Sequence, residues 1–288
     1  MNEAIRAMLR TYGPIKTKRD EENTLQEILQ QITLHGLYLG GFFDTAAFYG
    51  GTALRMLYGL DRFSEDLDFC LKNPDKNFDL QTYLSAIQEE LERYGFTAFI
   101  EEKRSGQDVA IEPAFVKQET ISGLMIIGRD GSSAQKGQRV KIRLEVDKTN
   151  PKGAHYCTKL IKLPTPYMIG TMTEGSLFAG KLHALIARAY LNRVKGRDYY
   201  DFLYYVARGT PVNFGYLEAK LVDSGHIQKN QHFGRDDLIE LLQQKFRDVD
   251  FKKAREDVIP FVKPERQKDL KSWSTQLFSA LALDIKTE

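Results

Sequence analysis

The sequence has few of the residues that indicate a secreted, zinc-binding or membrane protein. Its 288 residues include only two cysteines, Cys70 and Cys157, which allow at most one disulfide and have no zinc-ligand spacing. The first residues, MNEAIRAMLRTYGPIKTKRDEEN, contain no apolar core of the length found in a signal peptide. No run approaches the roughly 20 apolar residues that a membrane-spanning helix needs. We therefore expect a cytoplasmic protein in a reducing compartment.

Neither charge nor histidine dominates the composition. The 41 Lys and Arg residues nearly balance the 39 Asp and Glu residues, which gives a formal net charge of +2. That balance argues against bulk electrostatic wrapping of nucleic acid, although it allows a local basic groove. The histidines have no mutual spacing, which argues against a histidine-centred hydrolase or a zinc site. They are His35, His155, His183, His226 and His232.

The chain is long enough for about two domains, and its hydrophobic periodicity changes along its length. The expected strands are 46–49, 66–71, 96–103, 109–116, 123–128 and 139–147. The expected helices are 24–36 (with Asn23 or Thr24 as N-cap), 52–59, 78–95, 174–192, 198–209, 214–222, 235–248 and 270–285. This order predicts an α/β N-terminal half followed by a helical C-terminal half. The boundary is expected near residues 162–171, where two prolines break any helix.

Two of the expected strands carry carboxylates on one side. Residues two apart in a strand point to the same side, so Asp66 and Asp68 project together from DLDFCL. In RVKIRLEVD the apolar residues face one way, and Glu145 and Asp147 end the polar face. If the two strands are neighbours, these carboxylates converge, and cations must offset their repulsion. Rigidly held carboxylates suit Mg²⁺ or Mn²⁺, although such pairs are often solvated charges at a sheet edge.

A glycine pair lies upstream of these aspartates. Gly50 and Gly51 end an expected strand and open an expected helix. Glycine lets the backbone approach a phosphate, and the first amides of a helix favour an anion, although a Gly-Gly pair is more often a plain turn. Thr52 is followed 14 residues later by Asp66, so a phosphate-binding turn and a metal-binding strand are close in sequence. Nucleotidyl transfer requires this combination.

Other charged side chains surround this pattern. Arg62 and Ser64 flank the metal strand and are candidate triphosphate contacts, whereas Arg55 could equally be a surface residue of its helix. Lys181 and Arg188 are seven residues apart and therefore share one face of the expected helix. A lysine beside an apolar stripe often only extends its ammonium to water.

The stretch GGFFDTAAFYGGTALRMLYGLDRFSEDLDF resembles the AbiEii/AbiGii toxin family of nucleotidyltransferases, from bacterial toxin–antitoxin and phage-exclusion systems. LEVDKTNPKG, AGKLHALIAR and GRDYYDFLYY resemble later motifs of that family, so the resemblance covers residues 20–210. It implies an α+β fold of the DNA polymerase β-type nucleotidyltransferase superfamily. That fold is a mixed β-sheet with flanking helices, expected over residues 1–168, followed by a helical C-terminal domain over residues 169–288.

The resemblance also implies roles for single residues. Lys181 falls where the family has a lysine that contacts the nucleotide's phosphates. Asp198, otherwise a helix cap, becomes a candidate to deprotonate the acceptor hydroxyl or to fix Lys181, and Asp201 follows one turn later. Thr52 stands where many relatives have serine, and the extra Lys148 leaves open whether Glu145 or Asp147 is the third metal ligand. The candidates are Asp66, Asp68, Lys181 and Asp198 for catalysis; Gly50, Gly51, Thr52, Arg62, Ser64, Lys181 and Arg188 for nucleotide binding; and Asp66, Asp68, Glu145 and Asp147 for Mg²⁺ or Mn²⁺.

The implied reaction is metal-dependent transfer of a nucleoside monophosphate from a nucleoside triphosphate, with GTP one candidate, to an acceptor that the fold does not choose. Relatives that act on tRNA favour an RNA acceptor, and so does a basic track beside the proposed metal site, while a protein hydroxyl or a small molecule is the alternative. The track is Arg139, Lys141, Arg143, Lys148, Lys152, Lys159 and Lys162. As a toxin, the protein would have a cognate antitoxin as partner. The alternative function is a catalytically silent nucleotide-binding module that acts through a protein partner.

Overall fold

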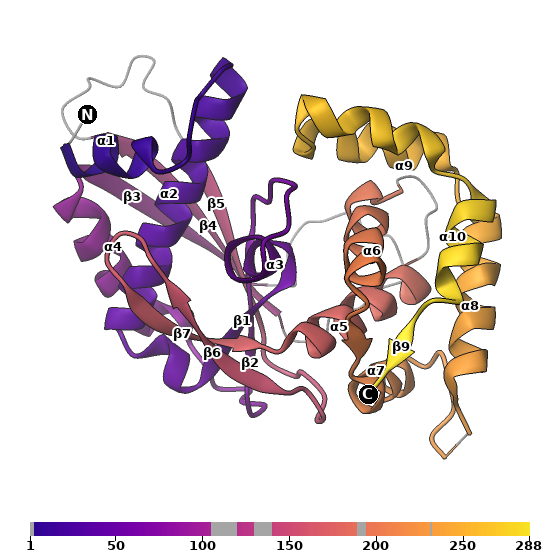
Figure 1. Cartoon of the computed structure of the whole chain (residues 1–288). Coiled ribbons are helices and arrows are strands. Elements are labelled where there is room, and N and C mark those ends of the chain that lie inside the picture. The colour runs from indigo at the N-terminus through magenta and orange to yellow at the C-terminus, as the bar shows by residue number, and fades with distance from the viewer. Residues whose placement is uncertain (1–2, 105–119, 130–139, 189–193, 231) are drawn as a thin grey trace.

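The computed structural model describes residues 3–104, 120–129, 140–188, 194–230 and 232–288. Its N-terminal half is built on a 7-stranded mixed sheet in the order β3-β4-β5-β2-β1-β7-β6 (Figure 1). The strands are β1 (Ala46–Tyr49), β2 (Leu67–Leu71), β3 (Phe96–Arg104), β4 (Thr120–Arg129), β5 (Val140–Asp147), β6 (Tyr156–Ile161) and β7 (Tyr167–Met172). Strand β2 is antiparallel to β1 and parallel to β5, which confirms that the two carboxylate-bearing strands are neighbours. The expected strand 109–116 lies outside the described residues.

Helices α1 (Glu3–Arg10), α2 (Lys18–Leu39) and α4 (Leu84–Arg93) lie beside this sheet (Figure 1). The expected start of α2 at residue 24 is wrong, because Thr17 is the N-cap. The Thr17 hydroxyl accepts from the Asp20 N–H (3.1 Å), and the Asp20 carboxylate accepts from the Thr17 N–H (3.0 Å), which forms a capping box. Gly36 does not end the helix. A Cβ at Gly36 would lie 2.8 Å from Cα of Ile87, so glycine allows α2 and α4 to pack closely.

Two hydrophobic clusters lie on opposite faces of the sheet. The first joins α2 and α4 to Phe48, Phe69 and Val146, which are fully buried. The alternate residues Ala47 and Cys70 belong to the second cluster, which fills the helical half. Because Asp68 lies between Phe69 and Leu67 in β2, its side chain shares the face of Cys70 and points toward the helical half.

The C-terminal half is helical, as its sequence pattern predicts (Figure 1). Its elements are α5 (Glu174–Ala187), α6 (Gly196–Arg208), β8 (Pro211–Val212), α7 (Phe214–Asp223), α8 (Arg235–Asp248), α9 (Phe251–Val258), the 3-10 helices η3 (Ile259–Phe261) and η4 (Pro264–Ser272), α10 (Thr275–Ala282) and β9 (Lys286–Thr287). Helix α5 ends at Ala187 instead of residue 192, with Arg188 in an extended conformation. The expected single helix 270–285 is divided at Trp273, because Ser274 caps a new helix by accepting from the Leu277 N–H (3.2 Å).

The expected domain boundary falls within the sheet. Strand β7 crosses residue 168 and pairs with β6 and β1, while the turn 162–166 that contains both prolines joins β6 to β7. The two prolines therefore lie in the turn of a β-hairpin. The division into 1–168 and 169–288 stays a prediction.

A loop between α3 (Gly50–Tyr58) and β2 connects the two halves. The Phe63 N–H donates to the carbonyl of Phe261 (2.8 Å), and the Tyr200 hydroxyl donates to the Asp61 carboxylate (2.7 Å). This loop also contains Arg62 and Ser64, so it brings two candidate site residues to the junction. The sheet, its flanking helices and the helical half together confirm the α+β class. None of the helices in the described ranges combines the length and apolar character needed to cross a membrane.

Candidate active site

The glycine turn lies directly against the aspartate strand. Gly50 has φ of 80°, a left-handed conformation that favours glycine, and α3 begins at this residue. A Cβ at Gly50 would lie 2.2 Å from Oδ2 of Asp68, and one at Gly51 would lie 2.7 Å from Nη2 of Arg62. The Thr52 hydroxyl donates to the carbonyl of Asp66. Both glycines are therefore required by close approach of side chains that the sequence predicts to be functional.

The carboxylates of β2 and β5 align in register. Asp68 is paired with Glu145 and Cys70 with Asp147, so the four side chains share one face of the sheet. Asp147 uses its Oδ1 to accept from the Thr149 N–H (3.0 Å), and Glu145 lies 3.8 Å from a guanidinium nitrogen of Arg143. Asp66 precedes β2. Within the described ranges, no three His, Cys, Asp or Glu side chains are grouped so as to hold a metal ion, so the metal-ligand set stays a prediction.

A buried ion-pair network lies at the start of α6. Lys181 Nζ is 2.8 Å from Oδ1 of Asp198 and 2.8 Å from Oδ2 of Asp201. Arg62 binds Asp201 with two nitrogens, Nε to Oδ1 (2.6 Å) and Nη2 to Oδ2 (2.7 Å). Arg188 pairs with the other oxygen of Asp198. The lysine is therefore held by two carboxylates and does not extend into water.

The network fixes the charge of its members. Burial alone would raise the pKa of both carboxyls, but Arg188 and Lys181 lower the pKa of Asp198, and Arg62 and Lys181 lower the pKa of Asp201. Burial would lower the pKa of Lys181, but Asp198 and Asp201 raise it. All of these groups are therefore ionised at neutral pH.

The structure shows what Arg62, Ser64 and Arg55 contact. Arg62 is buried and bidentate to Asp201, and Ser64 is buried beside Gly51, where its hydroxyl oxygen would lie 3.0 Å from an added Cβ. Arg55 is not a free surface residue. Its Nε donates to Glu27 of α2 (2.6 Å), and its Nη1 donates to the carbonyl of Arg62 (3.1 Å). Arg55 thus supports the loop that carries Arg62.

Sequence reasoning missed a polar cluster on the same sheet face. Asn150, which is buried, donates to the Tyr156 hydroxyl (3.2 Å) and accepts from the Tyr216 hydroxyl of α7. Burial and the carboxylates of Asp68 and Asp147 raise the pKa of Tyr49, which is paired with Asp68 across β1 and β2. Only the register of β1 could have indicated Tyr49, and no sequence signal joins Asn150 to α7.

The aromatic side chains of α6 belong to the core, with Tyr199, Phe202 and Tyr205 buried. The basic track is divided, because β5 and β6 are separated in the sheet by β2, β1 and β7. Lys148 donates to a backbone carbonyl (2.8 Å), and Lys159 lies over the ring of Tyr58 (4.7 Å). Arg139 lies outside the described residues.

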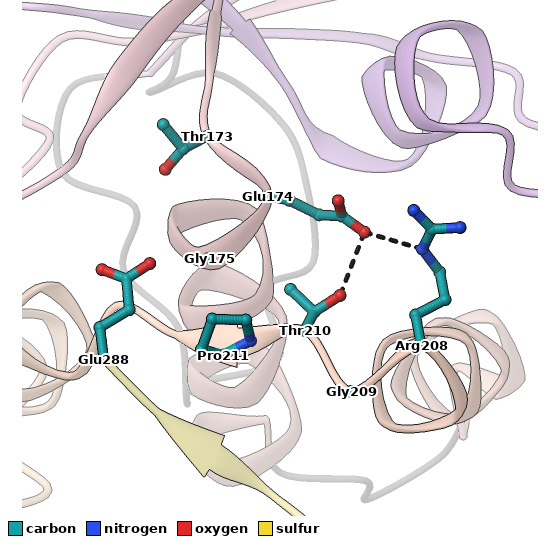
Figure 2. A pocket seen from close by; sticks show the side chains of 8 residues that line it. All are labelled: Thr173, Glu174, Gly175, Arg208, Gly209, Thr210, Pro211 and Glu288. Carbon is teal, nitrogen blue, oxygen red and sulfur yellow. Dashed lines mark hydrogen bonds and ion pairs between the residues drawn. The ribbon is translucent and has the colours of Figure 1, made fainter.

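A cavity of about 410 Å³ lies elsewhere, between the start of α5 and the β8–β9 pair (Figure 2). The Glu174 carboxylate accepts from Nε of Arg208 (3.0 Å) and from the Thr210 hydroxyl (3.1 Å), and Glu288 lies on the other side of the opening (Figure 2). None of the residues that line it is a candidate site residue, so this cavity is separate from the carboxylate face.

Comparisons with known proteins agree with the motifs. The family model described as nucleotidyl transferase AbiEii toxin, type IV TA system, matches residues 32–278. A proposed nucleotidyltransferase from H. pylori is 18% identical with a TM-score of 0.48, over 90% of this chain and 89% of that one. The structure of JHP933 from Helicobacter pylori is 19% identical with a TM-score of 0.48, over 92% and 88%. No curated protein matches the chain. On the family match, the chain belongs to the AbiEii toxin family and is a nucleotidyltransferase of the type IV toxin–antitoxin class.

Proposed function

We propose that this nucleotidyltransferase transfers a nucleoside monophosphate from a nucleoside triphosphate to an RNA hydroxyl, in a reaction that requires a divalent metal ion. The observation that carries the proposal is the register pair of Asp68 and Glu145, directly against the Gly50 turn. The cation network lies close to this turn, because a Cβ at Gly51 would lie 2.7 Å from Nη2 of Arg62, and Arg62 binds Asp201, which also binds Lys181.

The residues fit a hard divalent cation. Mg²⁺ is usually bound by one or two carboxylates together with water and substrate phosphates, and Asp68 and Glu145 supply two carboxylates on one face. We favour Glu145 over Asp147 as the ligand opposite Asp68, because Glu145 is the register partner of Asp68, whereas Asp147 is two pairs further along. Asp66, which lies directly before β2, is an additional candidate ligand. When bound, Mg²⁺ or Mn²⁺ would neutralise charge on the triphosphate during transfer.

The chain's own residues bind and orient the nucleotide. The first amides of α3, which begins at Gly50, would bind phosphate oxygens, and the ammonium of Lys181 would offset phosphate charge. Asp198 is held ionised by two cations and is a poor base, so we assign it to fixing Lys181. Arg62, saturated by Asp201, positions the loop before β2 and is not assigned a phosphate contact.

The finer identity of the partners rests on the family. We propose the tRNA acceptor end as the RNA, a cytoplasmic site of action and a cognate antitoxin as partner, with GTP one of the candidate nucleotides. The divided basic track gives less support to RNA than its sequence pattern does, since its strands are not neighbours.

A labelling experiment tests the proposal. The purified protein is incubated with Mg²⁺ and each α-labelled nucleoside triphosphate, with total RNA or total protein as acceptor. We expect label in tRNA, loss of that label with Asp68→Asn, and no change with Asp223→Asn, an exposed residue of α7. Label only in protein would refute the RNA acceptor. Nucleotide binding without release of pyrophosphate for any acceptor would indicate a silent binding module.

A further inference from the structure

Two buried asparagines hold the loop between β5 and β6 against the helical half. Asn150 follows Asp147, the last residue of β5, and its Oδ1 accepts from the Tyr216 hydroxyl of α7. Asn213 is the N-cap residue of α7, and its Nδ2 donates to the carbonyl of Gly153 (2.8 Å). The loop that follows the carboxylate strand β5 is therefore attached to α7 at two points.

The same contacts extend to α5, the helix that carries Lys181. Nδ2 of Asn213 also donates to the Ser176 hydroxyl in the first turn of α5 (3.0 Å). That hydroxyl, which is buried, accepts in addition from the His155 N–H at the end of the loop (2.8 Å). Hydrogen bonds thus join the loop after β5 to the helix whose lysine is assigned to the nucleotide's phosphates.

Asn150 also fixes the loop on the side of the sheet. Its Nδ2 donates to the Tyr156 hydroxyl of β6 (3.2 Å), and the Thr149 N–H beside it donates to Oδ1 of Asp147 (3.0 Å). Both polar atoms of the buried Asn150 side chain are therefore paired. Because an unpaired polar atom is unfavourable in a buried site, this amide favours one arrangement of β6, the loop and α7.

We propose that Asn150 is a positioning residue that sets the spacing between the carboxylates of β5 and Lys181, by joining the β5–β6 loop to α7. This inference rests on the proposed function, which assigns metal binding to Glu145 and phosphate binding to Lys181. A metal-bound triphosphate must meet both groups at once, so a small displacement of β5 relative to α5 weakens binding. Residues that orient metal ligands typically contribute about 10–100-fold to metal affinity.

Tyr216→Phe removes only the hydroxyl from which Asn150 accepts, so it tests the link with little change in packing. Calorimetric titration of Mn²⁺, with a non-hydrolysable nucleoside triphosphate present, should show an affinity about tenfold below that of the wild type. Raising the Mn²⁺ concentration should restore transfer by this variant, because its carboxylates are displaced and not removed. Asn150→Ala should show at least the same loss of affinity.

Tyr12→Phe is the matched control. The Tyr12 hydroxyl accepts from the side-chain amide of Gln31 in α2, within the hydrophobic cluster on the opposite face of the sheet. Each of the two tyrosine variants loses one tyrosine–amide hydrogen bond, so an effect of general destabilisation would appear in both. Tyr12→Phe should keep the Mn²⁺ affinity of the wild type.

The opposing results are distinct. Equal Mn²⁺ affinity in Tyr216→Phe, Tyr12→Phe and the wild type would overturn the positioning role, and labelled transfer by the wild type would then leave the proposed function standing. If Asn150→Ala does not fold, the comparison of Tyr216→Phe with Tyr12→Phe decides. Weakened Mn²⁺ binding in Tyr216→Phe alone, with no transfer by the wild type to any acceptor, would refute the proposed function and leave the positioning role standing.

Discussion

Replacing Asp201 by Asn tests the buried network most severely. The Asp201 side chain is 0% exposed and the Arg62 side chain 3%, and the carboxylate binds both Arg62 and Lys181. The substitution leaves these cations with only Asp198, which already pairs with Arg188. Breaking a buried pair by removing one partner typically costs about 3–5 kcal/mol. At about 2–4 °C per kcal/mol for a chain of this size, we expect a Tm loss of roughly 6–20 °C.

The measurement is thermal unfolding followed by circular dichroism, with Asp223→Asn as the exposed control. The double change Arg62→Met, Asp201→Leu should recover part of the loss, because it removes the buried charge together with its partner. A Tm within about 2 °C of wild type for Asp201→Asn would refute the reasoning. It would mean that the buried cations find other partners or water.

The remaining predictions follow from the same contacts. Gly50→Ala should destabilise the fold by about 1–2 kcal/mol through its left-handed backbone and should also lower nucleotide affinity by displacing Asp68; unchanged affinity in calorimetry would contradict this. Lys181→Met should weaken nucleotide binding at least tenfold and also lower Tm, since it leaves two carboxylates short of a partner, and a normal Tm would argue against the ion pairs. The folded-state pKa values of Asp198 and Asp201 are lowered, so the stability that these groups contribute is present above about pH 4 and is lost as pH falls below it; Asp201→Asn should flatten that acid limb in pH-dependent melting. Thr17→Ala should cost about 1 kcal/mol by removing the α2 cap, with no effect on nucleotide binding.

Local patterns predicted the elements that carry the carboxylates. The alternation of apolar and polar residues predicted which faces of β2 and β5 are buried. Because the two strands are neighbours, the same alternation places Asp68 and Glu145 on one face, where they are paired. The periodicity of the sequence did not predict the secondary structure of polar or irregular segments. The first turns of α2 are polar and read as a loop, and β6 and β7 were not among the expected strands.

Contacts between distant segments were beyond any local pattern. Lys181 and Arg188 were expected to share one face of a helix. Helix α5 ends at Ala187, so Arg188 lies outside the helix, and the two side chains instead pair with the same carboxylate, Asp198. Arg62 and Asp201 are 139 residues apart, so nothing in the sequence indicated that the arginine is saturated by a carboxylate. Only the fold shows which side chains pair across the junction between the two halves, and this pairing decides the roles of Arg62 and Lys181.

In the proposed mechanism, Asp68 and Glu145 would hold the divalent metal ion that transfer of the nucleoside monophosphate requires. Titration of Mn²⁺ into the protein with a non-hydrolysable nucleoside triphosphate, followed by calorimetry, tests it directly. Asp68→Asn and Glu145→Gln should each abolish Mn²⁺ binding with an unchanged circular dichroism spectrum, whereas Asp147→Asn should retain it. Mn²⁺ binding that survives in the double variant Asp68→Asn, Glu145→Gln would contradict the account.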